Sequence, residues 1–338
     1  TLYAHWKANS YQIAFAANSG EGSMENQKFT YDVDGTLSKN TFVREGYTFA
    51  GWANAENADT ADYADEANVR NLTADADGIV TLYAVWKPVT YMVSFEKNGA
   101  DGGTMEEQTL TYDEEKSLQL NGYTKTGYHF VGWASVLTDK QEVDYTDGAS
   151  VRNLTSTAGE KVTLYAVWEA NTYTITFNAN DGAGTTMPPQ TFTYDAVAEA
   201  LSMNTYTRAN YTFMGWAKEK TAEKAEYEDK QAVRNVVATE NGELTLYAVW
   251  RPDSFQVKLD PNGGTMTGET VITMHYGQQV GKLPSPSRVG YTFKYWNTGK
   301  NGNGINVYQT LTADSIANNG SDTLYAIWEA NHYTALYD

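Results

Sequence analysis

The chain has 338 residues, of which 42 are acidic and 24 basic, so its net charge is −18, and it contains no cysteine. Hydrophobic residues make up 41% of it, which is enough to build packed cores and unlike a disordered acidic segment. The lack of cysteine excludes a disulfide scaffold, a thiolate metal site and a cysteine nucleophile. The negative charge argues against nucleic acid and anionic membranes as partners. No apolar run reaches the ~18 residues that a membrane span needs, so we expect no membrane insertion.

One hexapeptide recurs along the chain and shows that the sequence is built from repeats. It reads Thr-Leu-Tyr-Ala-Val-Trp at 81–86, and copies with at most one change begin at Thr1, Thr163, Thr245 and Thr323. A second signature, Gly-Tyr-Thr-Phe-Ala-Gly-Trp at 46–52, has related copies that end at Trp133, Trp216 and Trp296. All nine tryptophans belong to one of these two motifs. The repeating unit is therefore the basis for any prediction of fold or function.

The motifs divide the chain into four complete repeats flanked by two partial ones. The expected boundaries are 1–10 for the tail of a preceding repeat and its linker, 11–90, 91–172, 173–254 and 255–332 for repeats 1 to 4, and 333–338 for the start of a following repeat. Short linkers join the repeats, and Pro88 and Pro252 stiffen two of them, so we expect an extended arrangement in which neighbouring repeats contact each other.

The net negative charge decreases from the first repeat to the last. Residues 11–86 carry 4 basic and 12 acidic side chains (net −8), 91–168 carry 6 and 12 (net −6), 173–250 carry 6 and 10 (net −4), and 255–328 carry 5 and 4 (net +1). Acidic neighbours repel one another over a short range, which favours a soluble, extended array.

The pattern within one repeat predicts strands and one short helix. An alternating run such as 11–15 indicates a half-buried strand, and a Gly- and Asn-rich turn ending in Met leads to a returning strand through Tyr31. Residues 195–201 have modest helical character, with Asp195 as the candidate N-cap. The segment 46–52 predicts a third strand with a bulge at Gly51, and the hexapeptide predicts the closing strand. This order predicts a small α+β domain that is rich in strands.

The turn of the form x-Gly-Gly-Thr-Met, the segment Gly-Tyr-Thr-Phe-x-Gly-Trp and the closing Thr-Leu-Tyr-Ala-x-Trp occur in a constant order. This combination resembles the Listeria–Bacteroides repeat family, also called the internalin B-type B-repeat. The resemblance covers all four repeats. It implies a β-grasp (ubiquitin-like) fold for each repeat, and tandem copies in secreted or cell-wall-attached bacterial proteins. The expected fold is therefore a tandem array of four α+β, β-grasp repeats with one short helix each.

No motif for catalysis, metal binding or cofactor binding stands out. The four histidines (His5, His129, His275 and His332) fall at unrelated repeat positions, without the partner spacing of a zinc site or a catalytic triad. The clusters Asp32-Val33-Asp34-Gly35 and Asp75-Ala76-Asp77-Gly78 lack the ligand spacing of a calcium loop and are interpreted as solvated acidic loops, with weak calcium binding as the alternative. We expect no enzyme and no cofactor.

Aromatic residues could serve the core or stack on a ligand. Eight repeated tryptophans are expected in the repeat core, because so small a domain needs large apolar side chains: Trp52, Trp86, Trp133, Trp168, Trp216, Trp250, Trp296 and Trp328. Four other aromatic residues are candidate ligand contacts, on the argument that the shared fold does not require them: Phe42, Tyr123, Tyr206 and Tyr295.

Three repeats contain a Val-Arg-Asn sequence, with Arg70, Arg152 and Arg234 at its centre. Arginine suits planar pairing with a carboxylate or the capping of carbonyl groups within the long loop. The alternative is a stripe of arginines that binds a partner, but the fourth repeat has no matching arginine. The structural interpretation is therefore preferred.

These observations favour a non-catalytic stalk or spacer in a bacterial cell-surface or secreted protein, one that projects a terminal functional domain from the cell wall. This interpretation rests in part on the family resemblance. The alternative is a repeat-based adhesin that binds a host surface protein or glycan by avidity. The other expected contacts are with neighbouring repeats of the same chain, and Leu2, Tyr3 and Trp6 are expected to pack in order at the first partial repeat.

Overall fold

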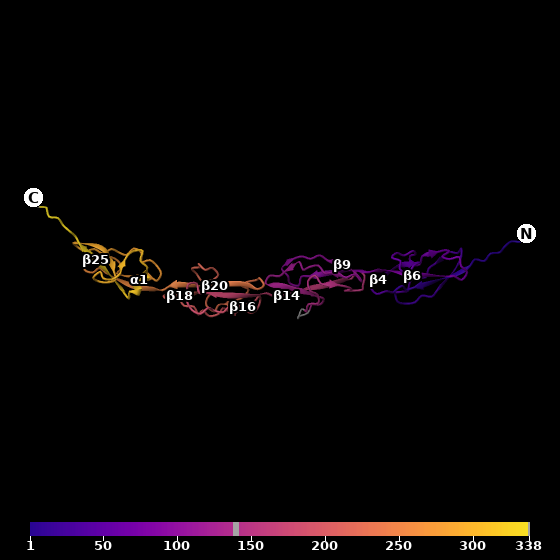
Figure 1. The fold of residues 1–338 in the computed structure, drawn as a ribbon, viewed down its shortest axis with the longest axis horizontal. Coiled ribbons are helices and arrows are strands. Elements are labelled where there is room, and N and C mark those ends of the chain that lie inside the picture. Colours follow the sequence, from indigo (N-terminus) through magenta and orange to yellow (C-terminus); the bar gives the residue numbers. More distant parts are fainter. Residues whose placement is uncertain (138–141, 337–338) are drawn as a thin grey trace. The chain divides into compact units, whose positions relative to one another are not determined.

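The computed structural model describes residues 1–137 and 142–336. The chain divides into two compact units, residues 1–170 and 171–338, and each unit contains two repeats. Figure 1 colours the chain from indigo at the N-terminus to yellow at the C-terminus, and strands make up nearly all of its regular structure. Each repeat forms its own sheet and its own hydrophobic core.

Repeat 1 is built on a four-stranded sheet in the order β2-β1-β6-β4. The two central strands, β1 and β6, are parallel, and each pairs with an antiparallel strand at its outer edge. A two-stranded sheet of β3 and β5 completes the repeat. The strands are β1 (Ser10–Ala16), β2 (Gln27–Thr30), β3 (Gly35–Thr36), β4 (Tyr47–Ala53), β5 (Asn68–Val69) and β6 (Ile79–Pro88).

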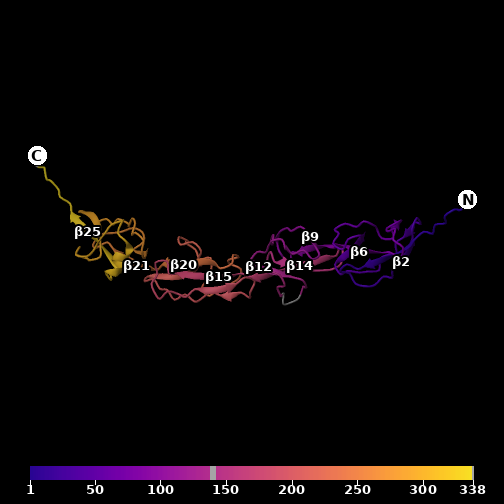
Figure 2. The same ribbon diagram turned by 45° about the vertical axis from the view of Figure 1, so that its right-hand side comes forward.

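Repeats 2 and 3 have the same topology, with main sheets in the orders β12-β14-β7-β9 and β16-β15-β20-β18. Figure 2 shows β15 beside β20, its parallel partner at the centre of the repeat 3 sheet. The strands of repeat 2 are β7 (Thr90–Glu96), β8 (Gly102–Gly103), β9 (Gln108–Thr111), β10 (Lys116–Ser117), β11 (Tyr123–Thr124), β12 (Tyr128–Ala134), β13 (Ser150–Val151) and β14 (Lys161–Ala170). Those of repeat 3 are β15 (Thr172–Asn178), β16 (Gln190–Thr193), β17 (Glu199–Ala200), β18 (Tyr211–Ala217), β19 (Ala232–Val233) and β20 (Gly242–Pro252).

Repeat 4 has one five-stranded sheet in the order β22-β21-β25-β23-β24, and it contains a helix. Its elements are β21 (Ser254–Asp260), β22 (Val271–His275), β23 (Tyr291–Asn297), β24 (Asn306–Val307), α1 (Ala313–Asn318) and β25 (Thr323–Ala330). The helix lies between the last two strands and buries Ala313 and Ile316 in the core. Among the described residues, α1 is the only α-helix.

The predicted α+β, β-grasp class with one helix in each repeat is therefore wrong, because the repeats are almost entirely β. The segment 195–201 shows the physical reason. Asp195 has a left-handed backbone (φ 58°), and Glu199 and Ala200 pair with β19 instead of with their own turn. A helix of seven residues forms few internal hydrogen bonds, and these do not offset the free-energy cost of helix nucleation. Strand pairing with a second segment is therefore more favourable here. Leu201 then enters the core beside the strands.

The predicted bulge in the third strand is confirmed. The pairing of β4 with β6 shifts register between Phe49 and Gly51, and the other repeats show the same shift. Gly51 has φ 135°, and a Cβ atom there would lie 2.5 Å from the Tyr63 carbonyl oxygen. Only glycine allows the loop backbone to approach the strand so closely.

Residues 1–9 and the described residues 333–336 lie outside the strands. Thr1 to Trp6 lie outside regular structure, and Leu2 and Trp6 are exposed, so the expected ordered packing of this segment is wrong. Tyr333 is also exposed, and residues 337–338 of the expected partial repeat 333–338 lie outside the described residues. Within residues 1–137 and 142–336, no helix is long and apolar enough to span a bilayer.

Candidate functional site

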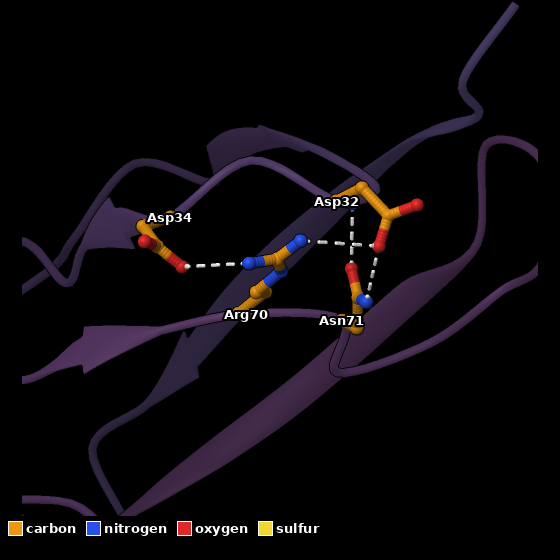
Figure 3. A network of polar contacts seen from close by, with 4 residues as sticks. All are labelled: Asp32, Asp34, Arg70 and Asn71. Carbon is orange, nitrogen blue, oxygen red and sulfur yellow. Dashed lines mark hydrogen bonds and ion pairs between the residues drawn. The ribbon is translucent and has the colours of Figure 1, made fainter.

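An aspartate, an arginine and an asparagine form a polar clamp in each of the first three repeats. In repeat 1 the Asn71 side chain accepts a hydrogen bond from the Asp32 backbone N–H (2.7 Å) and donates one to Asp32 Oδ1 (2.9 Å). Arg70 lies between two carboxylates, with Nη2 3.4 Å from Asp32 Oδ1 and Nη1 3.9 Å from Asp34 Oδ1 (Figure 3). The clamp ties the turn after β2 to the segment that follows β5.

Backbone conformation explains why these residue types occur at the clamp. Asp32 and Asn71 both have left-handed backbones, with φ 62° and 55°, and Asp and Asn tolerate this conformation better than most residues. The hydrogen bond from Asn71 is the main cause that holds the pKa of Asp32 below its ordinary value, and Arg70 adds to it. Both carboxylates around Arg70 are largely exposed, so the ion pairs are weak and the amide contacts matter more.

Repeats 2 and 3 reproduce the clamp with the same geometry. Asp113 accepts from Arg152 (3.0 Å) and Asn153 (2.9 Å). Asp195 accepts from Arg234 (3.1 Å) and Asn235 (2.7 Å). The predicted pairing of each arginine with a carboxylate is therefore confirmed. The asparagine next to each arginine has an equal part in the clamp that was not predicted, although the Arg-Asn pair recurs in three repeats.

Repeat 4 binds the same turn by another route. Gly277 occupies the position of the clamp aspartate, with φ 72°, and its backbone N–H donates to Asp314 Oδ2 at 2.7 Å. Asp314 lies in the first turn of α1, so the helix supplies the acceptor that asparagine supplies in the other repeats. Both solutions satisfy the same backbone donor.

The clamp of repeat 2 also contacts repeat 1. The Tyr47 hydroxyl donates to Asp113 Oδ2 at 2.8 Å, and the rings of Tyr47 and Tyr112 meet edge to face at 5.9 Å. Burial raises the pKa of Tyr47, and the hydrogen bond to Asp113 adds to this shift. Arg44 stacks on the Tyr47 ring with its guanidinium carbon 3.6 Å from the centroid. We call this contact between repeats 1 and 2 joint 1.

The linker residue in joint 1 is bonded to both repeats. The Val89 N–H donates to the Gly46 carbonyl, and the Val89 carbonyl accepts from the Tyr112 N–H, both at 2.9 Å. Asp253 does the same between repeats 3 and 4, donating to Asn210 and accepting from Tyr276. We call that contact joint 2. In joint 2 a Cβ atom on Gly277 would lie 2.2 Å from the Tyr211 hydroxyl, so the tyrosine covers the glycine.

The repeated tryptophans divide into two sets. Four are buried, with exposed fractions of 0 to 3%: Trp52, Trp133, Trp216 and Trp296. Four are partly buried and pack against the same cores: Trp86, Trp168, Trp250 and Trp328. All eight repeated tryptophans therefore contribute to the hydrophobic cores of their repeats.

Three of the four candidate ligand contacts lie at one equivalent position against a core tryptophan. Phe42 and Tyr206 are buried, and Tyr123 is half-buried. Each ring meets its tryptophan edge to face, at 6.1 to 6.4 Å. These three residues therefore belong to the shared fold, and the premise that it does not require them is wrong. Only Tyr295 lies elsewhere, in β23 of repeat 4, and ligand contact there stays a prediction.

Within the described parts of the chain, no three His, Asp or Glu side chains converge into a cluster suited to a metal ion. Asp32 and Asp34 face Arg70, and Asp77 accepts a hydrogen bond from Ser10.

Comparison with known proteins identifies the repeats. The model of the Listeria-Bacteroides repeat domain matches residues 11–85, 91–167, 173–249 and 255–327. The chain belongs to this family. A protein of Evansella cellulosilytica named "Putative Gly-rich membrane protein" is 28% identical over all of this chain and 36% of its own length. Internalin H of Listeria monocytogenes is 33% identical over 43% of this chain and 23% of its own length. The chain thus spans well under half of the length of these two relatives.

A likeness to a solved structure is much weaker. The Bacillus anthracis TIE protein covers 72% of this chain, and 51% of that chain is covered, with 10% identity and a TM-score of 0.28.

Proposed function

We propose that these Listeria-Bacteroides repeats form a non-catalytic stalk in a bacterial cell-surface or secreted protein that is attached to the cell wall. The stalk would hold a terminal functional domain away from the cell. A relative named as a membrane protein and an internalin support the surface location. A spacer needs independently folded repeats and restrained joints, not a reactive group.

The observation that carries this proposal is the bonding of one linker residue to both of its neighbours. Val89 has backbone hydrogen bonds to repeats 1 and 2, and Asp253 has them to repeats 3 and 4. A flexible linker would leave these backbone groups to water. Val89 is also only 5% exposed, so bending joint 1 would expose apolar surface.

The repeated surface gives the adhesin alternative less support. Binding by avidity requires the same exposed side chains in several repeats. The repeated tryptophans are buried or half-buried, and the aromatic position of Phe42 faces the core. A spacer, by contrast, requires only that the cores and joints be kept.

Pulsed electron spin resonance on the full chain tests the proposal. Because the chain has no cysteine, Lys39→Cys and Glu114→Cys place one label on each repeat of joint 1 without background. We expect a narrow distance distribution that broadens on Tyr47→Ala. Tyr333→Ala, at an exposed residue outside both joints, is the control and should leave the width unchanged. A broad distribution in the unmodified joint would overturn the stalk.

A further inference from the structure

Repeat 4 has an aromatic surface, and Tyr295 is its first element. In the first three repeats this position is a glycine covered by loop backbone, as Gly51 is by the Tyr63 carbonyl. In repeat 4 the bulge remains between Phe293 and Tyr295, but a tyrosine occupies it. The loop must therefore lie differently, and the ring of Tyr295 is half-exposed.

The position of a second tyrosine, Tyr308, supplies the second element. In repeat 1, Trp52 pairs with Tyr63, and the Tyr63 ring packs against the core. In repeat 4, Trp296 pairs with Val307, which takes the buried position. Because successive residues of an extended chain point to opposite faces, Tyr308, which directly follows the buried Val307, points away from the core. Tyr308 is accordingly 57% exposed.

The two tyrosines line one hollow of about 210 Å³. Their ring centroids are 6.5 Å apart and the ring planes are inclined by 51°, so the two rings form adjacent, tilted sides of the hollow. The polar side chains around them are Lys282, Lys294, Ser285 and Gln309. None of the residues described as lining this hollow is acidic.

The hollow lies in a repeat that lacks the net negative charge of the other three. Repeat 4 has a net charge of +1, while the whole chain has −18. At a screening length of about 8 Å, the acidic loops of distant repeats have little effect here. Lys294 pairs with Glu329 at 2.7 Å, whereas Lys282 has no ion-pair partner within the described part of the chain. Lys282 can therefore attract a carboxylate without first breaking an ion pair.

We propose that this hollow binds an acidic oligosaccharide, with a sugar ring against Tyr308 and Tyr295 and a uronate carboxylate on Lys282. The electron-rich faces of tyrosine suit the polarised C–H groups of a sugar ring. Gln309 and the tyrosine hydroxyls can bond sugar hydroxyls, and the lysine is a strong donor to a carboxylate. A few polar groups around an aromatic floor match a small-ligand site better than the broad interface a protein partner needs.

Calorimetry on the full chain with oligogalacturonate tests the proposal, and the methyl ester of the same oligosaccharide is the uncharged probe. We expect saturable binding with a Kd on the order of 0.1–1 mM. Tyr308→Ala should weaken binding about tenfold, and Lys282→Gln should weaken it several-fold and reduce its dependence on salt. The methyl ester should bind more weakly than the acid.

Tyr333→Ala is the matched control, because it removes another exposed tyrosine outside the hollow. It should leave binding unchanged. Tyr295→Gly restores the residue of the other repeats and should also weaken binding. Near-ultraviolet circular dichroism of each variant checks that repeat 4 stays folded. The proposal is overturned by a lack of saturable oligogalacturonate binding, by full binding in folded Tyr308→Ala, or by equal binding of the methyl ester. The stalk proposal does not depend on any of these outcomes.

Discussion

Repeat 3 and repeat 4 build the same turn from different residues. In repeat 3, Asp195 has a left-handed backbone and its N–H is bound by Asn235. In repeat 4, Gly277 takes the left-handed position and Asp314 accepts its N–H from a helix that repeat 3 does not contain. The two repeats keep the left-handed backbone and a hydrogen-bond acceptor for its N–H, but different side chains supply the acceptor.

The buried tryptophans show a second difference between the repeats. The indole N–H groups of Trp52, Trp133 and Trp216 are buried and have no hydrogen-bond partner among the described protein groups. Trp296 donates to the Pro284 carbonyl at 2.9 Å. The altered segment before β23 thus satisfies a donor that is left without an acceptor in the first three repeats. Repeat 4 is a rearranged version of the fold, with compensations at several sites.

The largest expected effect concerns the glycine of the bulge. Gly215 has φ 129°, and a Cβ atom would lie 2.4 Å from the Tyr227 carbonyl oxygen. Gly215→Ala should destabilise repeat 3 by about 3 kcal/mol, through backbone strain and the clash together. Hydrogen exchange should report faster exchange of the β18 and β20 amides, with repeat 1 as the internal reference.

Gly281→Ala in repeat 4 separates the two causes. Gly281 also has a positive φ (69°), but nothing lies within 4 Å of its would-be Cβ atom. Gly281→Ala should lower the free energy of unfolding of repeat 4 by only about 1–2 kcal/mol, from the strain of a left-handed backbone. Equal losses of protection in the two variants would mean that the approach of the Tyr227 carbonyl is not what requires glycine.

The next effect tests whether the two turns are equivalent. Asn235→Ala in repeat 3 and Asp314→Ala in repeat 4 each remove the acceptor of one backbone N–H. Each should destabilise its own repeat by about 1–2 kcal/mol. Amide exchange of residues 195 and 277 reads out the two turns separately. Asp314→Asn keeps an acceptor oxygen and should lose much less stability than Asp314→Ala. An equal loss in the two variants would mean that Asp314 acts through its negative charge and not through this hydrogen bond.

The sequence predicts the main strands and fails at the connection after the second one. Alternation at Tyr11, Ile13 and Phe15 identifies a strand because burial repeats every second residue. Propensity misleads at Ala196 to Leu201, because pairing with β19 depends on a segment thirty residues further on. The intrinsic preferences of neighbouring residues contain no information about such a distant pairing partner. The helix of repeat 4 was missed for the same reason, since burial of Ile316 makes it stable.

The candidate site was predictable in part. The arginine–carboxylate pairing follows from residue type, and the repetition of Arg-Asn in three repeats points to a shared role. The role of Asn71 depends on the left-handed backbone of Asp32, which no single residue of the pattern reveals. The prediction of Phe42 as a ligand contact rests on the premise that the shared fold does not require it. Aligning it by its distance to the buried tryptophan would have placed it in the core.

A smaller effect distinguishes the two joints. Tyr47 donates to the Asp113 carboxylate in joint 1, while Tyr211 in joint 2 covers Gly277, which has no side chain to accept. Tyr47→Phe should weaken joint 1 by about 1 kcal/mol, because it removes a hydrogen bond to a charged group but keeps the ring contacts. Tyr211→Phe should have a smaller effect on joint 2. Exchange of the Val89 and Asp253 amides measures each joint, and equal effects would show that the carboxylate contributes little.

The smallest effect is the response of joint 1 to acid. Hydrogen bonds from Asn153 and Tyr47, with help from Arg152, hold the pKa of Asp113 below its ordinary value of 3.8. A carboxyl whose pKa is lower in the folded protein adds stability that is complete above pH 3.8 and is lost as the pH falls through the folded pKa. Acidification below pH 3.8 should therefore lower the protection of the Val89 amide against exchange. High salt should reduce the part of this effect that comes from Arg152.

Asp113→Asn removes the titrating group and serves as the matched control for this response. Its Val89 exchange should vary with pH only through the intrinsic chemistry of exchange, and its joint should be weaker at neutral pH because asparagine carries no charge for Arg152. The carboxylate is exposed, so the acid effect should be small beside those of the glycine and of the clamp acceptors. An acid response that persists in Asp113→Asn would have to come from another carboxylate, and the coupling of the repeat 2 clamp to repeat 1 through Tyr47 would then lose its electrostatic part.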